Sequence, residues 1–317
     1  MSDRPLIAAA GPVAGRVATE LRSWATLVAG DDDEPLEPAK VREIRAAEGL
    51  LIDTRLRIDE ELLVRLPALR VVASAAVGYD NIDLAACAER AVLVSNGRGA
   101  LDDAVADLAL ALVLMCRRQI PASLAWATSG AWVGGPAPFA HDVAGATLGI
   151  YGLGAIGLEL AKRARACGMR LAYHNRRQRD DDAETRATYR SLTDLARCAD
   201  VLVILTPLTN ETRGRFSREL LACMQPTACL VNVARGPIVD LSALYDALVS
   251  GALAGAALDV TDPEPLPPAH PLYELPNVVI VPHIGSATFE TRERMSLLAA
   301  RNLAAFFRGA PLLTPVQ

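Results

Sequence analysis

The sequence predicts an α/β protein with two doubly wound parallel sheets, and three observations lead to this fold class. Short apolar runs alternate with segments of helical periodicity along almost the whole chain, which is typical of parallel sheets covered by helices on both faces. The 317 residues are about twice the size of a common domain. Hydrophobic residues make up 51% of the chain and charged residues 22%, so we expect a packed core and no extensive disorder.

The first series of elements forms one predicted sheet. Apolar runs flanked by turn residues are typical of buried strands, and they lie at Leu6–Ala10, Gly49–Ile52, Val71–Ser74 and Val92–Val94. Helical patterning predicts helices between them, at Ala14–Arg22, Pro38–Ala47, Glu60–Leu66 and Leu84–Arg90.

A second series predicts the other sheet. A long helix from Leu101 to about Arg118 precedes it, followed by an irregular stretch with Trp126 and Trp132. The strands expected next are Thr147–Tyr151, Arg170–His174, Val201–Leu205, Cys229–Val233, Ala254–Leu258 and Val278–Val281. The expected helices are Ala155–Cys167, Leu192–Arg197, Arg218–Cys223 and Leu241–Ser250. A final helix at about Phe289–Arg308 has no strand after it, so we expect that it returns to the first unit.

Charge and cysteine usage narrow the function classes. The formal net charge is −5 and no basic stripe offsets it, which argues against nucleic acid and membrane surfaces as partners. The six cysteines show no CxxC pair and no metal-like spacing, so we expect free thiols in a reducing compartment and no metal. The N-terminal residues do not have the layout of a signal peptide. The expected location is therefore the cytoplasm.

A glycine-rich turn predicts a dinucleotide site. Gly152, Gly154 and Gly157 form GxGxxG directly after the strand Thr147–Tyr151 and open the helix that begins at Ala155. In this context the glycines permit a tight turn, a close approach to a pyrophosphate and close helix packing. The helix N-terminus offers unpaired N–H groups to the phosphates.

The residues after the next strand predict a preference for NADP. An enzyme that uses NAD usually has Asp or Glu there to bind the ribose 2′-hydroxyl. In this chain Asn175, Arg176 and Arg177 follow the strand, and no carboxylate occurs before Asp180. Two guanidinium groups can bind a 2′-phosphate by charge-assisted hydrogen bonds. We therefore expect NADP as cofactor, with NAD bound at lower affinity.

Three polar residues that follow later strands predict acid–base chemistry. Arg235, Glu264 and His283 lie at or just after expected strand ends, where open α/β sheets bind ligands. A histidine can donate a proton near neutrality, and a carboxylate bonded to its other nitrogen favours the protonated form. An arginine can bind a carboxylate and polarise a keto oxygen. Each residue alone is as readily structural, and it is their joint placement that favours catalysis.

With these residues the sequence resembles the D-isomer-specific 2-hydroxyacid dehydrogenases, and within that family the NADPH-dependent glyoxylate/hydroxypyruvate and hydroxyphenylpyruvate reductases. The resemblance extends from about Gly49 to the end of the chain. The matching segments are Ala76–Asp83, Val105–Asp107, Gly152–Gly157, Thr206–Thr209, Asn232–Gly236, Leu258–Pro265 and Pro282–Ser286.

The resemblance implies the role of each matching residue. Arg235 would anchor the keto acid, Glu264 would pair with the imidazole, and His283 would be the acid–base catalyst. Backbone N–H groups of Val77 and Gly78 would bind the substrate carboxylate, which agrees with the expectation that a loop of small residues forms an anion nest. The further cofactor contacts that we expect are Ala155, Ile156, Thr206, Pro207, Val233, Ala234, Asp259, His283 and Gly285, with Asp259 on the nicotinamide carboxamide.

The resemblance also implies a split domain arrangement. Residues 1–98 and 286–317 would form a flavodoxin-like substrate domain, into which a Rossmann cofactor domain of residues 99–285 is inserted. The region 101–145 resembles the family's dimer-forming region, so we expect a homodimer. The roles of five residues stay open. Trp132, Phe139 and His141 could reach a neighbouring active site, although core or interface packing is favoured. Thr54 and Arg55 could face the substrate, and a surface loop explains them equally well.

Alternatives from other classes remain. An NAD(P)-sensing binding module like the corepressors of this fold is one, although we find no partner-binding extension in the sequence. Phosphoglycerate, formate and phosphite dehydrogenases are others within the family. The sequence does not rank glyoxylate, hydroxypyruvate and bulkier keto acids as substrates.

Overall fold

The computed structural model describes residues 4–11, 13, 15–29, 44–180 and 185–316, and its chain divides into two compact units. Unit 1 comprises residues 1–101 and 288–317, and unit 2 comprises residues 102–287. The domain boundaries expected after residues 98 and 285 fall within a few residues of these bounds. Each unit is an α/β layer structure built on one parallel sheet, as predicted.

The sheet of unit 1 has five strands in the order β2-β1-β3-β4-β5. Each described pair of neighbours is parallel. This order is the flavodoxin-like order 2-1-3-4-5, and it confirms the predicted fold class. The strands are β1 (Leu6–Ala9), β2 (Thr26–Ala29), β3 (Gly49–Ile52), β4 (Val71–Ser74) and β5 (Leu93–Ser95).

Helices cover both faces of this sheet, and its central strands β3 and β4 are fully buried. The long C-terminal helix α12 (Phe289–Phe307) packs on β3, β4 and α1 (Gly15–Arg22), so the final helix does return to the first unit. On the other face, α3 (Glu60–Arg65) and α4 (Leu84–Glu89) contact each other and enclose a cluster around Leu50, Leu63 and Val72. The helix expected over Pro38–Ala47 lies outside the described residues apart from its last four positions.

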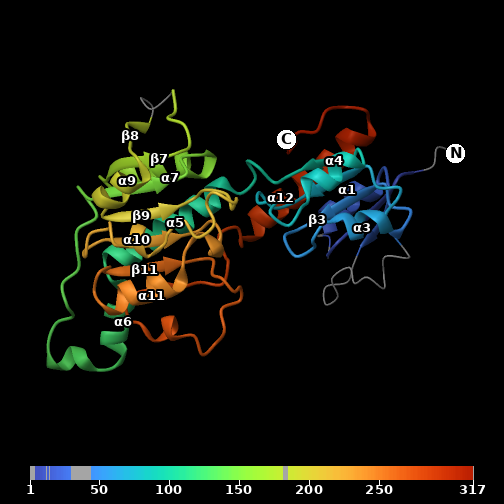
Figure 1. Ribbon diagram of the computed structural model, residues 1–317. Coiled ribbons are helices and arrows are strands. Elements are labelled where there is room, and N and C mark those ends of the chain that lie inside the picture. The colour runs from blue at the N-terminus through green and yellow to red at the C-terminus, as the bar shows by residue number, and fades with distance from the viewer. Residues whose placement is uncertain (1–3, 12, 14, 30–43, 181–184, 317) are drawn as a thin grey trace. The chain divides into compact units, whose positions relative to one another are not determined.

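The sheet of unit 2 has seven strands in the order β12-β11-β10-β9-β6-β7-β8, and each described pair of neighbours is parallel (Figure 1). From the other edge this is the Rossmann order 3-2-1-4-5-6 with one strand added. The strands are β6 (Thr147–Tyr151), β7 (Arg170–His174), β8 (Thr188–Tyr189), β9 (Val201–Ile204), β10 (Cys229–Asn232), β11 (Gly255–Leu258) and β12 (Val278–Ile280).

Two helix layers enclose this sheet. On one face α5 (Asp102–Arg117) packs against α7 (Ala155–Ala166) and against β9, β10 and β11. Arg163 of α7 joins the two helices through ion pairs to Asp103 at 2.8 Å and Asp107 at 2.6 Å. The other face carries α9 (Leu192–Cys198), α10 (Arg218–Leu221) and α11 (Leu241–Val249). Short 3₁₀ helices lie at Ala131–Gly134, Gly236–Ile238 and Pro271–Glu274.

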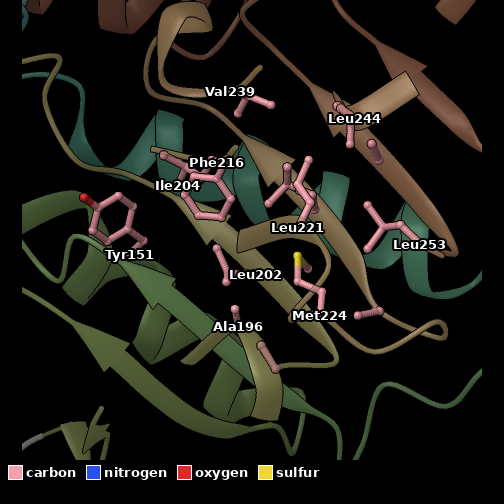
Figure 2. Packing of buried hydrophobic residues seen from close by; sticks show 14 of the residues in the cluster. Tyr151, Ala196, Leu202, Ile204, Phe216, Leu221, Met224, Val239, Leu244 and Leu253 are labelled. Atoms are coloured by element: carbon pink, nitrogen blue, oxygen red, sulfur yellow. The ribbon is translucent and has the colours of Figure 1, made fainter. Parts of the chain in front are cut away.

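The core of unit 2 on the α9–α11 face is an apolar cluster shown in Figure 2. Leu202 and Ile204 of β9 and the ring of Phe216 are fully buried at its centre. The ring of Tyr151, at the end of β6, lies 5.8 Å from that of Phe216 between centroids. This packing fixes where β6 and β9 end, and the loops that leave these two strands carry several of the predicted site residues.

Besides the short 3₁₀ helices, two strands and one α-helix of the described chain were not predicted from the sequence. The strands β2 and β8 lie at sheet edges, and the helix α6 (Ile120–Thr128) occupies part of the stretch expected to be irregular. A left-handed residue, Gln119 (φ 46°), separates α6 from α5. No single helix among the described residues is long and apolar enough to cross a membrane. In the described part of the chain, one pair of helices, α5 and α6, has the length and composition of a broken span, with a bend of 61°. Most of one face of α5 is buried in unit 2.

Candidate active site

The predicted site residues of unit 2 follow six neighbouring strands of one sheet, and Asn175, Arg176 and Arg177 follow β7. The glycine-rich turn follows β6, Thr206 follows β9, Arg235 follows β10, Glu264 follows β11 and His283 follows β12. These strands are parallel, so their carboxyl ends lie at one edge. The chain reverses its winding direction between β6 and β9, and ligands bind at such a switch point in open α/β sheets.

The glycine-rich turn has a geometry that only glycine permits at two positions. Gly152 has φ +107°, and a Cβ atom there would lie 2.7 Å from the backbone nitrogen of Thr206. A Cβ atom at Gly157 would lie 2.6 Å from the carbonyl oxygen of Gly152. Nothing in the described chain lies within 4 Å of a Cβ built on Gly154, and this residue caps α7 without a side-chain hydrogen bond. The N–H groups of the first turn, which begins at Ala155 and Ile156, therefore have no capping side chain and suit an anionic group.

Some residues after β7 hold the glycine-rich turn, and others are exposed. Asn175 is a structural residue in this geometry, since its Oδ1 accepts the N–H of Leu153 at 2.7 Å. Arg176 and Arg177 are exposed. Arg179, which was not singled out from the sequence, donates from Nη1 to the carbonyl oxygen of Leu153 at 3.1 Å. Its guanidinium thus lies against the glycine-rich turn. The position of Arg179 depends on its backbone N–H bond to the hydroxyl of Tyr173 (2.9 Å), a contact that no sequence pattern indicates.

The turn that carries Arg235 is held by a buried asparagine. Asn232, the last residue of β10, donates to the carbonyl oxygen of Arg235 at 2.9 Å and accepts the N–H of Ala234 at 3.1 Å. A Cβ atom at Gly236 would lie 1.9 Å from the carbonyl oxygen of Thr261, so this turn packs directly on the loop after β11. The polar Asn232 in an otherwise apolar strand was the available signal for this role.

The structure brings Glu264 and His283 together. Oε1 of Glu264 lies 2.6 Å from Nδ1 of His283, and the two side chains are 41% and 38% exposed. His283 is one of the few non-glycine residues with a left-handed backbone (φ 52°). Such a conformation costs free energy, and it persists where the surroundings impose it. Because Nδ1 is used by the carboxylate, Nε2 is the ring nitrogen left to face a ligand.

Asp259 imposes that backbone conformation. It is buried, with 3% of its surface exposed. Its Oδ1 accepts the N–H of Ile284 at 2.6 Å and its Oδ2 the N–H of Gly285 at 3.0 Å, while its carbonyl oxygen accepts the N–H of His283 at 2.9 Å. Burial raises the pKa of Asp259, although these N–H groups and His283 favour its charged form. Three consecutive residues of the histidine loop are thus bound to one aspartate.

Some of the other predicted residues of unit 2 follow strand ends at the carboxyl edge of the sheet, and the rest lie in the segment after α6. Thr206, Ala234 and the exposed Pro207 follow strand ends, and Val233 is buried beside them. Trp132, Phe139 and His141 lie in the exposed segment after α6. Their side chains form no part of the glutamate–histidine pair.

The predicted carboxylate-binding loop belongs to unit 1. Val77 and Gly78 follow β4 and are half-buried, and within the described part of the chain neither of their N–H groups has an acceptor. Two adjacent free N–H groups are what an anion nest requires. Arg55, in the same unit, pairs with Asp53 through Nη2 and Oδ2 at 2.6 Å, so a structural partner accounts for it.

Comparisons with known proteins agree on one family. The family model of the D-isomer specific 2-hydroxyacid dehydrogenase, NAD binding domain, matches residues 110–285. The chain is 42% identical over 287 residues to a glyoxylate reductase of Pyrococcus horikoshii, covering 88% of this chain and 86% of that protein. It is also 42% identical over 277 residues to a hydroxyphenylpyruvate reductase of Plectranthus scutellarioides, covering 87% of each.

Solved structures resemble the whole chain. An NADPH-dependent glyoxylate/hydroxypyruvate reductase from Sinorhizobium meliloti, in complex with NADP and malonate, superposes with a TM-score of 0.89 at 36% identity, covering 99% of this chain and 97% of that one. A glyoxylate reductase from Paecilomyes thermophila gives a TM-score of 0.90 at 33% identity, covering 100% and 99%. The matching family model, the relatives and the two sheet orders show that this chain belongs to the D-isomer-specific 2-hydroxyacid dehydrogenase family.

Proposed function

We propose that this protein reduces small 2-keto acids, such as glyoxylate and hydroxypyruvate, to D-2-hydroxy acids with NADPH. The observation that carries the proposal is the contact of 2.6 Å between Glu264 and His283 at the sheet edge that also carries the glycine-rich turn. The relatives named as glyoxylate and hydroxyphenylpyruvate reductases support this substrate class.

The residues at the sheet edge fit a dinucleotide. Gly154 leaves open space at the N-terminus of α7, and Gly152 brings the turn against the backbone of Thr206. Val233, Ala234 and Gly285 supply further backbone at the same edge. We assign the pyrophosphate to the N–H groups of the turn. A bound NADPH supplies the hydride for the carbonyl carbon.

The protein's own residues then stabilise and protonate the keto oxygen as negative charge develops on it. His283, protonated and held at Nδ1 by Glu264, donates a proton from Nε2 to that oxygen. Arg235, fixed by Asn232 at its backbone, binds the keto acid and stabilises the developing alkoxide. In unit 1 the N–H groups of Val77 and Gly78 bind the substrate carboxylate.

The cofactor preference rests on charge. Arg176 and Arg177 are exposed, Arg179 lies against the glycine-rich turn, and no carboxylate in residues 170–179 opposes a 2′-phosphate. Each charge-assisted hydrogen bond to the phosphate is worth about 1.5–3 kcal/mol. We therefore propose NADP as the preferred cofactor and NAD as a weaker one. Asp259, whose two oxygens already hold the histidine loop, keeps lone pairs for the nicotinamide carboxamide that we assign to it.

One kinetic comparison tests this function. Purified protein is assayed with glyoxylate and hydroxypyruvate, using NADPH and NADH, in the wild type and in the double variant Arg176→Ala/Arg177→Ala. We expect the double variant to raise the KM for NADPH at least tenfold and that for NADH little. Arg197→Ala removes an exposed arginine of α9 and serves as the matched control. A wild type that prefers NADH contradicts the cofactor assignment, and one that reduces no 2-keto acid contradicts the function and favours a binding module.

We also propose a homodimer formed through the region 101–145. None of the nine residues of α6 is buried, although the helix is mostly apolar. Leu124, Trp132, Val133 and Phe139 expose 59%, 70%, 96% and 97% of their surfaces. Several exposed apolar residues within one short segment of the chain favour an interaction site there. The long helix α5 is largely covered within unit 2, so α6 and the segment after it carry this proposal. Sedimentation should show a species of twice 33.6 kDa, and Trp132→Glu should shift it to the monomer.

The cytoplasm is the location that we propose. All six cysteines are free, which agrees with a reducing compartment. Fractionation of the source cells, with the chain detected by antibody, tests this location.

A further inference from the structure

The Val77–Gly78 loop of unit 1 is held in place by a buried asparagine from the neighbouring strand. Asn96 directly follows β5 and exposes only 8% of its surface. Its Nδ2 donates to the carbonyl oxygen of Val77 at 2.8 Å. One residue further, the N–H of Gly97 donates to the carbonyl oxygen of Ala76 at 2.7 Å. Two successive carbonyl groups of the loop are therefore turned toward the end of β5.

This arrangement decides where the N–H groups of the loop point. The carbonyl and the N–H of one peptide unit are antiparallel, so fixing the carbonyl oxygens of Ala76 and Val77 directs the N–H groups of Val77 and Gly78 the opposite way. These are the two N–H groups without an acceptor in the described part of the chain. A Cβ atom at Gly97 would lie 2.1 Å from the carbonyl oxygen of Ala75, which shows how closely the two loops pack.

Asn96 is in turn held by the C-terminal segment. Its backbone N–H donates to the carbonyl oxygen of Thr314 at 3.1 Å, and its own carbonyl oxygen accepts the hydroxyl of Thr314 at 2.5 Å. Asn302 of α12 is fully buried. Its Oδ1 accepts the N–H groups of Leu313 and Thr314 at 2.9 and 3.1 Å, and its Nδ2 donates to the Thr314 hydroxyl at 3.0 Å. The segment thereby pairs with the free edge of β5, through a bridge between Ser95 and Pro315.

We propose that Asn96 is a positioning residue for the substrate carboxylate, and that Thr314 and Asn302 hold it in that role. The proposal rests on the keto-acid reductase function for the identity of the anion. Asn96 does not touch the substrate in this assignment; it orients the two N–H groups that do. The C-terminal segment of the chain thus sets the affinity for the anion through the partly buried Thr314 and the buried Asn302 and Asn96.

The test measures anion affinity apart from catalysis. Oxamate, a carboxylate analogue of a 2-keto acid that cannot be reduced at a ketone, is titrated calorimetrically into the NADPH-saturated protein. The KM for glyoxylate and kcat are measured in parallel. Asn96→Ala should raise both the Kd for oxamate and the KM for glyoxylate about tenfold, while the Kd for NADPH changes less than twofold. Thr314→Val should give a smaller loss in the same direction, and Thr314→Ser, which keeps the hydroxyl, should behave as wild type.

The controls separate positioning from folding. Asn277→Ala removes another partly buried amide that donates to a backbone carbonyl, that of Ala254 in unit 2, and should leave the affinity for oxamate unchanged. If Asn96→Ala fails to fold, the proposal is tested by comparing the oxamate affinity of Thr314→Val with that of Thr314→Ser. Wild-type oxamate affinity in folded Asn96→Ala or Thr314→Val would overturn the proposal. Oxamate binding that depends on Asn96 in a protein that reduces no keto acid would support the anion loop and contradict only the reductase function.

Discussion

Replacing Glu264 by glutamine removes the negative charge next to His283 and keeps the size and shape of the side chain. The contact that is changed joins Oε1 and Nδ1 at 2.6 Å, with the two side chains about two-fifths exposed. A hydrogen bond to a charged partner contributes about 1.5–3 kcal/mol, and exposure to water reduces the electrostatic part. We therefore take the lower end, about 1.5 kcal/mol, which corresponds to a loss of about tenfold in kcat/KM.

The direction of the effect follows from the proposed mechanism. Reduction requires a proton from Nε2 of His283, and the carboxylate of Glu264 at Nδ1 orients the ring and stabilises its proton-donating form. Glutamine keeps the shape of the side chain but carries no charge, so we expect kcat/KM for reduction to fall about tenfold.

The assay measures kcat/KM for glyoxylate reduction by NADPH at one fixed pH, with substrate well below KM. The Kd for NADPH and the unfolding temperature are recorded to establish that the variant is folded and binds its cofactor. Glu274→Gln changes an exposed glutamate of the same unit and serves as the matched control. A kcat/KM within about twofold of wild type in folded Glu264→Gln, well short of the expected tenfold loss, would refute the catalytic pairing.

Three further outcomes follow from the structure. His283→Asn is chosen because asparagine tolerates the left-handed backbone of this position (φ 52°). It should lower kcat by about 10²–10⁴-fold and still bind NADPH in a fluorescence titration. Near-normal turnover would exclude His283 as the proton donor. Phe216→Ala, at a fully buried position, should lower the free energy of unfolding in urea by about 3–5 kcal/mol, and a loss below about 1 kcal/mol would contradict the packing in Figure 2. Burial and the nearby Asp83 raise the pKa of Cys87 from 9.0 to about 11, so its thiol should resist Ellman's reagent at pH 8 until the protein unfolds. The native state should also lose stability as the pH rises above 9, because the unfolded thiol loses its proton first; rapid labelling of Cys87 in the native protein, located by mass spectrometry, is the contrary result.

The local sequence sufficed to predict an element where the residues of that element alone have a clear pattern. The strands Thr147–Tyr151 and Arg170–His174 have the predicted bounds, because continuous apolar runs between turn residues are unambiguous in a buried parallel sheet. β2 and β8, two of the four edge strands in the described sheets, were missed for the opposite reason. β8 has two residues and β2 has four, and such strands gain their stability from the neighbour with which they pair. The helix α6 was hidden by Pro121, which is tolerated in the first turn of a helix.

In the candidate site, too, some features were predictable from the local sequence and others depend on contacts between distant parts of the chain. The sequence by itself determined the family, the glycine-rich turn and the candidates Arg235, Glu264 and His283, because each lies in a short motif of residue types that its chemistry requires. Only the tertiary structure decided which groups meet. Asn175 binds Leu153 within unit 2, Asp259 binds the loop of His283, and Asn96 joins the Val77 loop to Thr314. These partners lie 22, 25 and up to 218 positions apart in the chain. A hydrogen bond depends on distances of about 3 Å, and for partners so far apart those distances are set by how the strands are ordered in each sheet and by how the core packs.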